Sequence, residues 1–356
     1  MPSIYCHDQT ASDEKSKVRG VGRYLQILKE NFPDWLFTNK LHTTNYSLPT
    51  ILINPFFNFL QPPLTMGRIA RKQISVIHDL IPLKYPKHFP VGIKGRFNIF
   101  LNKLALRNYD LIITDSEASK RDIVSMLKVN VSRVKVIYPC LPKIFNNTAN
   151  SSAFMVHGKK TTNYELSTMN YCIYVGDATW NKNLVNLAKA IKIINVTCVF
   201  IGKIFEQFKT TNYELLTMNL SHSWQQELKQ FVEETKNDKR FIFAGFVPDE
   251  ELIHLYQNAR CNILVSRDEG FGFSYLEATS QGCPSVLSDI PVLKEISDSQ
   301  GALFANPENP NKIANAIGEL YFRKDTRNTL GIAAQKRSEY FKGKNFKDKF
   351  KKVLDL

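Results

Sequence analysis

Short apolar runs alternate along the chain with segments in which apolar residues recur every three or four positions. In the first part of the chain, the short runs predict strands over residues 4–7, 51–54, 74–78, 111–114 and 134–138. The longer pattern predicts helices within 23–31, 93–107 and 118–127. Because parallel strands need a crossover connection, this alternation predicts a parallel sheet.

The alternation starts again at Tyr171, with strands expected over 197–201, 241–244, 261–265, 285–287 and 302–305. Two such runs predict an α/β protein with two doubly wound, Rossmann-like domains. The intervening residues are rich in Asn, Ser and Thr and lack periodicity, which is typical of a linker. We therefore expect an N-terminal domain over 1–145, a linker over 146–170, a second domain over 171–322 and a helical tail over 323–356.

One short sequence occurs twice. KTTNYELSTMN at 160–170 and KTTNYELLTMN at 209–219 are identical at ten of eleven positions, and a fragment of it stands at 43–50. Structural repeats are longer and follow one another along the chain. The isolated copies therefore predict insertions in surface loops, with a short binding motif as the alternative.

The charge is unevenly distributed. The 356 residues carry a formal net charge of +14, and their composition is that of an ordered globular protein. Residues 1–145 include 21 basic and 10 acidic residues, and residues 323–356 include 11 and 4. This predicts a face for an anionic membrane or a phosphorylated acceptor, with a merely soluble basic surface as the alternative. No RNP, KH or zinc-finger pattern supports nucleic-acid binding.

The six cysteines are scattered, without a CxxC pair or a zinc-ligand spacing, so we expect reduced core thiols. The first residues lack the basic start and apolar core of a signal peptide, which predicts a cytoplasmic protein. The uncharged stretch over 41–67 is interrupted by prolines and is not expected to span a membrane.

The residues after the expected strand 261–265 carry the chemistry. Glu269 is followed by the glycine-rich turn Gly270-Phe271-Gly272, and a helix expected from Phe273 carries Glu277. In open parallel sheets, ligands bind beyond the carboxyl ends of the strands, where helix N-termini offer free N–H groups to phosphate. Glu269 is therefore expected at the mouth of a crevice, and Glu277 just inside the helix, reaching back toward the same crevice.

These two glutamates, separated by seven residues within EGFGFSYLEA, resemble the signature of retaining glycosyltransferase family 4, which has the GT-B fold. The resemblance extends to GFVP at 245–248, YVG at 174–176, KN at 182–183, GVGRY at 20–24 and HD at 78–79. It implies two Rossmann-like domains facing a central cleft.

The resemblance also implies roles for individual residues. Glu277 would bind the nucleotide ribose, and Glu269, as a catalytic residue, would orient the donor sugar and stabilise positive charge at its anomeric carbon. Lys182 would neutralise the leaving diphosphate. His78, the second implied catalytic residue, would contact the donor sugar from the first domain. The other implied donor-binding residues are Gly176, Val247, Gly270, Phe271, Gly272, Phe273 and Ser274, and the implied acceptor-side loop contains Gly20, Gly22 and Arg23.

One departure concerns the phosphate contacts. The family usually has an arginine soon after the glycine at Gly176, and this chain has Asp177. Arg267 or Lys203 could substitute for it. No Asp-x-Asp pair occurs, so we expect a metal-independent reaction. Retention through departure and attack on the same face of the sugar is implied by the family.

The resemblance therefore predicts a cytoplasmic hexosyltransferase, peripheral at the inner face of the membrane, with no cofactor. It would move a hexose, with mannose favoured, from a GDP- or UDP-linked donor to a glycan or lipid-linked acceptor. A nucleic-acid-binding or other non-catalytic binding protein, a sugar epimerase and a phosphorylase remain alternatives on the same scaffold. The basic tail is expected either to lie on the membrane or to close back onto the first domain, and the second is favoured.

Overall fold

The computed structural model describes residues 3–10, 20–39, 50–146, 169–209, 220 and 222–355, and the chain forms two compact units. Unit 1 comprises Met1–Lys143 and Phe341–Leu356, and unit 2 comprises Ile144–Tyr340. The linker residues 147–168 and most of the short repeats lie outside the described residues.

Unit 1 is built on a six-stranded parallel sheet in the order β2-β1-β3-β4-β5-β6. Five of its strands were predicted, three of them with the observed bounds. The edge strand β2 was missed because its three residues are too few to show a period. The strands are β1 Ile4–His7, β2 Leu36–Thr38, β3 Ile51–Asn54, β4 Lys72–Val76, β5 Leu111–Thr114 and β6 Val134–Val136.

The helices of unit 1 are α1 Val21–Asn31, α2 Ile81–Lys84, α3 Ile93–Ala105, α4 Glu117–Leu127 and α14 Gly343–Leu354. Helix α4 begins where the Ser116 side chain accepts a hydrogen bond from the Ser119 N–H, as a helix N-cap does. One core cluster joins residues of α3 and α4 to strands β5 and β6.

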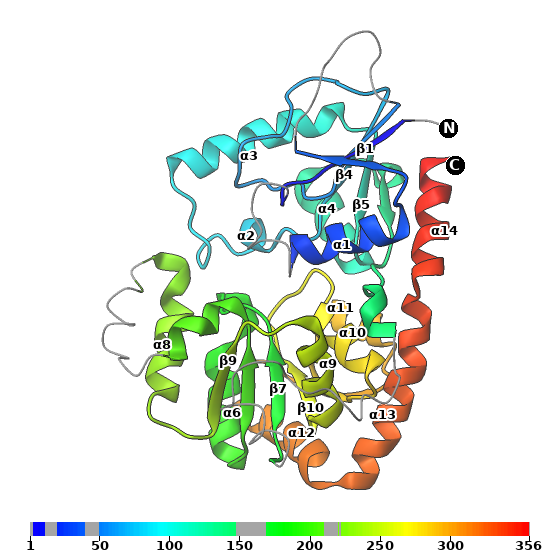
Figure 1. Cartoon of the computed structure of the whole chain (residues 1–356). Helices are drawn as coiled ribbons and strands as arrows, with labels where there is room; N and C mark the ends of the chain where they lie inside the picture. The colour runs from blue at the N-terminus through cyan, green and yellow to red at the C-terminus, as the bar shows by residue number, and fades with distance from the viewer. Residues whose placement is uncertain are drawn as a thin grey trace. The chain divides into compact units, whose positions relative to one another are not determined.

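Helix α14, at the end of the chain, is part of the core of unit 1 (red in Figure 1). Phe346 and Phe350 are 2% and 0% exposed. Phe350 packs against Phe32 and Trp35, which follow α1, with ring centroids 5.5 and 5.7 Å away. The apolar side of this helix is thus covered by protein.

Unit 2 contains the second parallel sheet, in the order β12-β11-β10-β7-β8-β9. All six strands lie where the apolar runs predicted them, within one or two residues. They are β7 Cys172–Val175, β8 Cys198–Ile201, β9 Phe241–Gly245, β10 Cys261–Leu264, β11 Ser285–Ser288 and β12 Ala302–Ala305.

The helices of unit 2 form two layers. Helix α6 contacts both α8 and α12 on one face of the sheet, and α9 and α13 contact α10 (Figure 1). The bounds are α6 Leu184–Ile194, α8 Gln226–Thr235, α9 Asp249–Asn258, α10 Phe273–Ser280, α11 Pro291–Ser297, α12 Pro310–Phe322 and α13 Lys324–Ser338.

The cysteine prediction is confirmed, because all six thiols lie in described residues and are free and buried. Among the described residues, no helix is both long enough and apolar enough to cross a bilayer.

The packing of α14 predicts that the end of the chain stabilises unit 1. Phe350→Ala removes a fully buried aromatic ring and should lower the free energy of unfolding by about 3 to 5 kcal/mol, measured by urea denaturation. The exposed neighbour Lys351 supplies the control, since Lys351→Ala should change it by less than about 0.5 kcal/mol. Equal effects of the two changes would contradict the packing.

Candidate donor-binding site

The candidate site lies at the carboxyl edge of the sheet in unit 2. Strands β7 and β10 are neighbours there, and all the strands run in parallel, so the segments that follow them emerge side by side. After β7 comes the short 3-10 helix η5, Trp180–Lys182. After β10 comes the loop that leads into α10.

An ion pair joins these two segments. The Lys182 ammonium donates to both carboxylate oxygens of Glu269, with Nζ–O distances of 2.7 and 3.0 Å. The Ser266 hydroxyl donates to the same carboxylate at 2.6 Å. The Glu269 side chain is only 8% exposed and that of Lys182 is 21% exposed, so solvent screens the pair weakly.

Two further hydrogen bonds, both accepted by backbone carbonyls, fix the two segments to each other. The Arg267 N–H donates to the Asn181 carbonyl at 2.7 Å, and the Asn181 side-chain amide donates to the Asp268 carbonyl at 3.1 Å. These bonds join the residue directly before Lys182 to the two residues directly before Glu269. They hold Lys182 and Glu269 opposite each other with little freedom to move apart.

Helix α10 places the second predicted carboxylate. Glu277 is 4% exposed, and one of its oxygens accepts a hydrogen bond from the Tyr256 hydroxyl of α9 at 3.2 Å. The helix starts after Gly272, whose φ of 108° is unfavourable for other residues. A Cβ atom there would also come within 3.1 Å of three apolar side chains, including that of Leu264. The glycine therefore lets α10 start directly against the core.

The remaining predicted donor residues lie on the same segments or after neighbouring strands. Phe271 and Ser274 are buried and Phe273 is half-buried at the start of α10. Val247, after β9, is 3% exposed. A Cβ atom at Gly202, which follows β8, would overlap the Gly176 carbonyl oxygen, so the ends of β7 and β8 are in close contact.

Tyr174 belongs to β7, and the charge at the carboxyl edge of the sheet affects the pKa of its hydroxyl. Burial, and next the charge of Glu269, raise the pKa of the Tyr174 hydroxyl well above its ordinary value. The hydroxyl therefore stays protonated and donates to the Asp177 carbonyl at 2.6 Å. This bond fixes the turn that follows Gly176.

The two candidates for the missing arginine differ in their surroundings. Arg267 donates to the Trp180 carbonyl at 2.6 Å, pairs with Glu308 at 2.9 Å and lies 5.0 Å from the Trp180 ring centroid. It also pairs with Glu227 at 3.2 Å. Lys203 is exposed, one residue beyond Gly202. Arg267 is thus held in a structural network, whereas Lys203 faces solvent.

His78 lies in unit 1, where its ring is held on both sides. Nδ1 is 2.5 Å from an Asp115 carboxylate oxygen, and Nε2 is 3.0 Å from the Pro55 carbonyl oxygen. Both partners only accept hydrogen bonds, so both ring nitrogens must carry protons. Burial opposes this charge, but Asp115, which is 2% exposed, outweighs it and raises the pKa of His78. The predicted contact with the donor sugar stays a prediction.

The expected acceptor-side loop is also in unit 1. Gly20 is exposed, with φ of 61°, and precedes α1, while Gly22 is buried. Arg23 is 1% exposed and donates to the Gln26 side chain at 3.2 Å. The guanidinium is therefore a buried group of unit 1 rather than a solvated cation, and its acceptor role stays a prediction.

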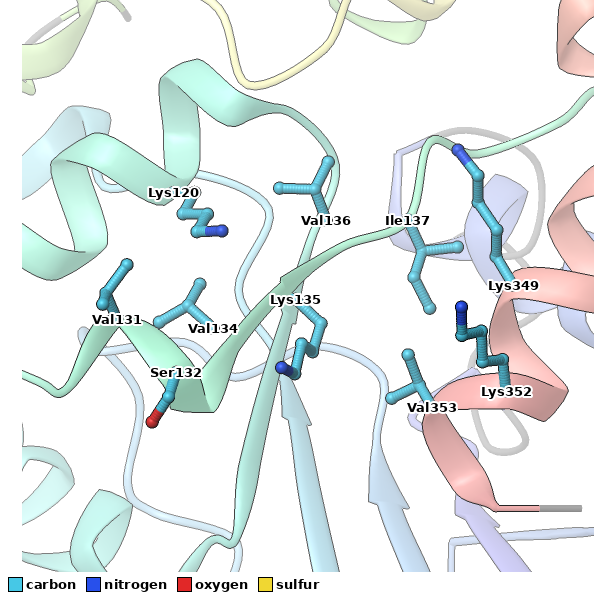
Figure 2. Close-up of a pocket in the computed structure, with 10 residues that line it drawn as sticks. All are labelled: Lys120, Val131, Ser132, Val134, Lys135, Val136, Ile137, Lys349, Lys352 and Val353. Atoms are coloured by element: carbon cyan, nitrogen blue, oxygen red, sulfur yellow. The ribbon is translucent and has the colours of Figure 1, made fainter.

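Unit 1 also has a shallow cationic pocket of about 420 Å³ that contains none of the predicted site residues. Figure 2 shows Lys120 of α4 on one side, Lys349 and Lys352 of α14 on the other, and Lys135 of β6 between them. Apolar side chains, among them Val136, form its walls. We call it the lysine pocket.

Three residues of the donor edge were not predicted. Ser266, Tyr256 and Asn181 contact Glu269, Glu277 and the loop before Glu269, respectively. Ser266 could have been found, because it directly follows the strand that leads to Glu269. In the described part of the chain, no three His, Cys, Asp or Glu side chains form a group that could hold a metal ion. Metal independence stays a prediction.

Two parallel α/β units, one with a carboxylate and lysine site at its carboxyl edge, define a nucleotide-binding class of fold. Within this class, residues 160–337 match the family described as "Glycosyl transferases group 1", which is half of the chain. The chain belongs to this family, as the sequence resemblance implied.

Two relatives whose names state an activity are about a quarter identical to this chain over the matched regions. The chain is 27% identical over 255 residues to the O-antigen chain mannosyltransferase RfbU of Salmonella typhimurium, which covers 71% of this chain and 62% of RfbU. It is 26% identical over 260 residues to the O-antigen chain mannosyltransferase B of Escherichia coli, covering 72% and 63%. The matched region thus spans less than two thirds of these relatives.

Solved structures share the whole fold. Sucrose-phosphate synthase from Thermosynechococcus elongatus superimposes with a TM-score of 0.72 at 15% identity, covering 100% of this chain and 98% of that one. Anabaena HepE in complex with UDP and glucose gives 0.68 at 16% identity, covering 100% of both. The predicted GT-B fold is confirmed.

The surroundings of His78 predict its titration. In a proton NMR titration, its midpoint should lie above the ordinary value of about 6.5, and Asp115→Asn should return it toward that value or below. Because the folded-state pKa is raised, the pair stabilises the protein fully below the unfolded pKa, and this contribution is lost as pH rises through the folded pKa. The His78→Gln variant lacks this imidazole, so the resonance that is missing from its spectrum is the one that belongs to His78. A midpoint below 6.5 in the wild-type protein would contradict the doubly protonated ring.

Proposed function

We propose that the protein is a retaining hexosyltransferase that moves mannose, as the first candidate sugar, from a GDP- or UDP-linked donor to a glycan or lipid-linked acceptor. The observation that carries this proposal is the arrangement of Lys182, Glu269 and Glu277 at the carboxyl edge of unit 2. The mannosyltransferase names of two relatives, and the UDP and glucose in a structural neighbour, support it.

Glu277 suits the nucleotide ribose. A carboxylate has four lone-pair positions and accepts hydrogen bonds from several hydroxyls at once, as Glu277 does from Tyr256. The two ribose hydroxyls can each donate to this group. Because Glu277 is buried in α10, such bonds form away from competing water, where they discriminate strongly against ligands without the hydroxyls.

The ion pair suits the change in charge during transfer. Without donor, Glu269 neutralises Lys182. A nucleotide diphosphate competes for the lysine, and Glu269 is then released to bind sugar hydroxyls and to stabilise positive charge at the anomeric carbon. The bond from that carbon to the diphosphate breaks with its electron pair going to the phosphate, beside Lys182. The oxygen of the acceptor hydroxyl then forms the new bond on the same face, and its proton passes to the departing phosphate oxygen.

We place this reaction in the cytoplasm, at the anionic inner face of the membrane. The basic excess of residues 1–145 supports that location, because an anionic surface attracts clustered lysines and arginines. A lipid-linked acceptor would be presented at the same surface.

Nucleotide binding tests the donor site. At about 100 times its dissociation constant, GDP or UDP should stabilise the protein by about 2.7 kcal/mol and raise its melting temperature by about 5 °C in a thermal-shift assay. Glu277→Gln should abolish most of this shift, since the neutral amide replaces a charged acceptor of two hydroxyl hydrogen bonds.

Glu250→Gln is the matched control, because Glu250 is exposed on α9 of the same unit. It should shift like the wild type. An unchanged shift in Glu277→Gln, or no shift with any of GDP, UDP and ADP, would count against the donor site. Donor consumption that yields an epimer or a sugar phosphate would instead favour an epimerase or a phosphorylase.

Lys203 should supply the phosphate contact that Asp177 cannot. Lys203 is exposed and directly follows Gly202, which lies against the Gly176 carbonyl, whereas Arg267 is already bound to Glu227 and Glu308. Lys203→Ala should weaken binding of the nucleoside diphosphate by about tenfold, as expected for one lost charge-assisted contact, and leave nucleoside binding unchanged by calorimetry.

Lys189→Ala is the control for this change. Lys189 is exposed on α6, so this variant should bind both ligands like the wild type. If Lys203→Ala weakens the nucleoside as much as the diphosphate, the lysine does not contact phosphate.

A further inference from the structure

Helix α3 of unit 1 has the opposite orientation from the one its sequence pattern suggests. Ile93, Phe97 and Phe100 follow one another at helical spacing, which normally marks the face turned to the core. In the structure they are 90%, 59% and 57% exposed. The helix, cyan in Figure 1, thus presents a row of large apolar side chains to the outside of unit 1.

Hydrogen bonds on the opposite face hold the helix in this orientation. Asn98 and Asn102 are buried there. The Asn98 amide donates to the Leu60 carbonyl at 2.9 Å, and that of Asn102 donates to the Gln61 carbonyl at 2.7 Å. Rotating the helix to bury its phenylalanines would break these partly buried bonds, and each lost bond costs stability.

The segment that contains α3 is basic, although its Lys84 is paired with Asp122 of α4 at 2.8 Å. Residues 80–109 include no acidic residue and six basic ones: Lys84, Lys87, Lys94, Arg96, Lys103 and Arg107. Arg96 and Lys103 are seven residues apart, so they border the apolar row along one side of the helix. A helix with phenylalanines on one face and lysines or arginines at its border has the composition of an interfacial membrane helix.

We propose that α3 binds the surface of an anionic bilayer, with Ile93, Phe97 and Phe100 inserted at the boundary between head groups and acyl chains. The inference rests on the membrane location proposed above and names the surface responsible. Charge favours a bilayer over a second copy of the chain, because two such segments would repel each other while anionic lipids attract both.

The basic end of the chain is a weaker surface for the same partner. The lysine pocket offers positive charge, but the apolar face of α14 beside it is buried in unit 1. Its lysines can attract anionic lipids from a distance, but Val131, 56% exposed, is a single small apolar side chain where α3 has a row of three (Figure 2). The two surfaces can therefore be separated by experiment.

Co-sedimentation with vesicles tests the proposal on the full chain. Phosphatidylcholine vesicles containing phosphatidylglycerol should bind the protein, and pure phosphatidylcholine should bind it much less. Phe97→Ser/Phe100→Ser should weaken binding by at least about tenfold without any change of charge, because two inserted rings are lost. Its melting temperature should not fall, since both rings are exposed.

Two further variants separate insertion from charge. Phe322→Ser/Ile332→Ser removes apolar side chains that are 64% and 72% exposed in unit 2 and should bind vesicles like the wild type. Lys135→Gln/Lys352→Gln, in the lysine pocket, should weaken binding less than the α3 variant does.

Wild-type binding by Phe97→Ser/Phe100→Ser would overturn the proposal. So would a dimer in gel filtration that this variant alone dissociates while vesicle binding is unchanged. A nucleotide-induced thermal shift without any vesicle binding would overturn the role of α3 and leave the donor site standing. Vesicle binding through α3 without a shift would count against the donor site alone.

Discussion

The pairing of β7 with β10 at the centre of the second sheet is the constraint on which the site depends. A parallel ladder brings the two carboxyl ends together, although Lys182 and Glu269 are 87 residues apart in sequence. The bonds between Asn181, Arg267 and Asp268 then fix the segments beyond the strands. The site is thus built on strand ends, and its precision comes from the sheet.

The same constraint explains how the ion pair can serve chemistry. Two nearly buried opposite charges stabilise a protein little once desolvation is counted. In the proposed function their value lies in exchange, because each partner holds the other in place until the phosphate and the sugar of the donor replace them. The Ser266 hydroxyl donates to the Glu269 carboxylate and would keep it oriented during that exchange, and Tyr174 fixes the neighbouring turn.

Much of this could be predicted from sequence because it depends on local order along the chain. A strand, a glycine-rich turn and a helix give the positions of Glu269 and Glu277 relative to the sheet edge. The surroundings of Arg267 and His78 could not be predicted, because Glu227, Glu308, Asp115 and Pro55 reach them from other elements. The three-residue strand β2 exists only through its pairing with β1.

Helices α3 and α14 show the limit of hydrophobic periodicity most clearly. The pattern identifies an apolar face but not what covers it. In α14 that face, with Phe350, is inside unit 1, while in α3 the face with Phe97 is outside. The two helices are oriented differently because of the residues on the side opposite the apolar face. On α14 these are lysines, which can remain in water. On α3 they are Asn98 and Asn102, which donate hydrogen bonds to the backbone carbonyls of Leu60 and Gln61. Buried amides, together with the small apolar contacts of Ile99 and Ala105, therefore decide which way α3 faces and leave its phenylalanines exposed.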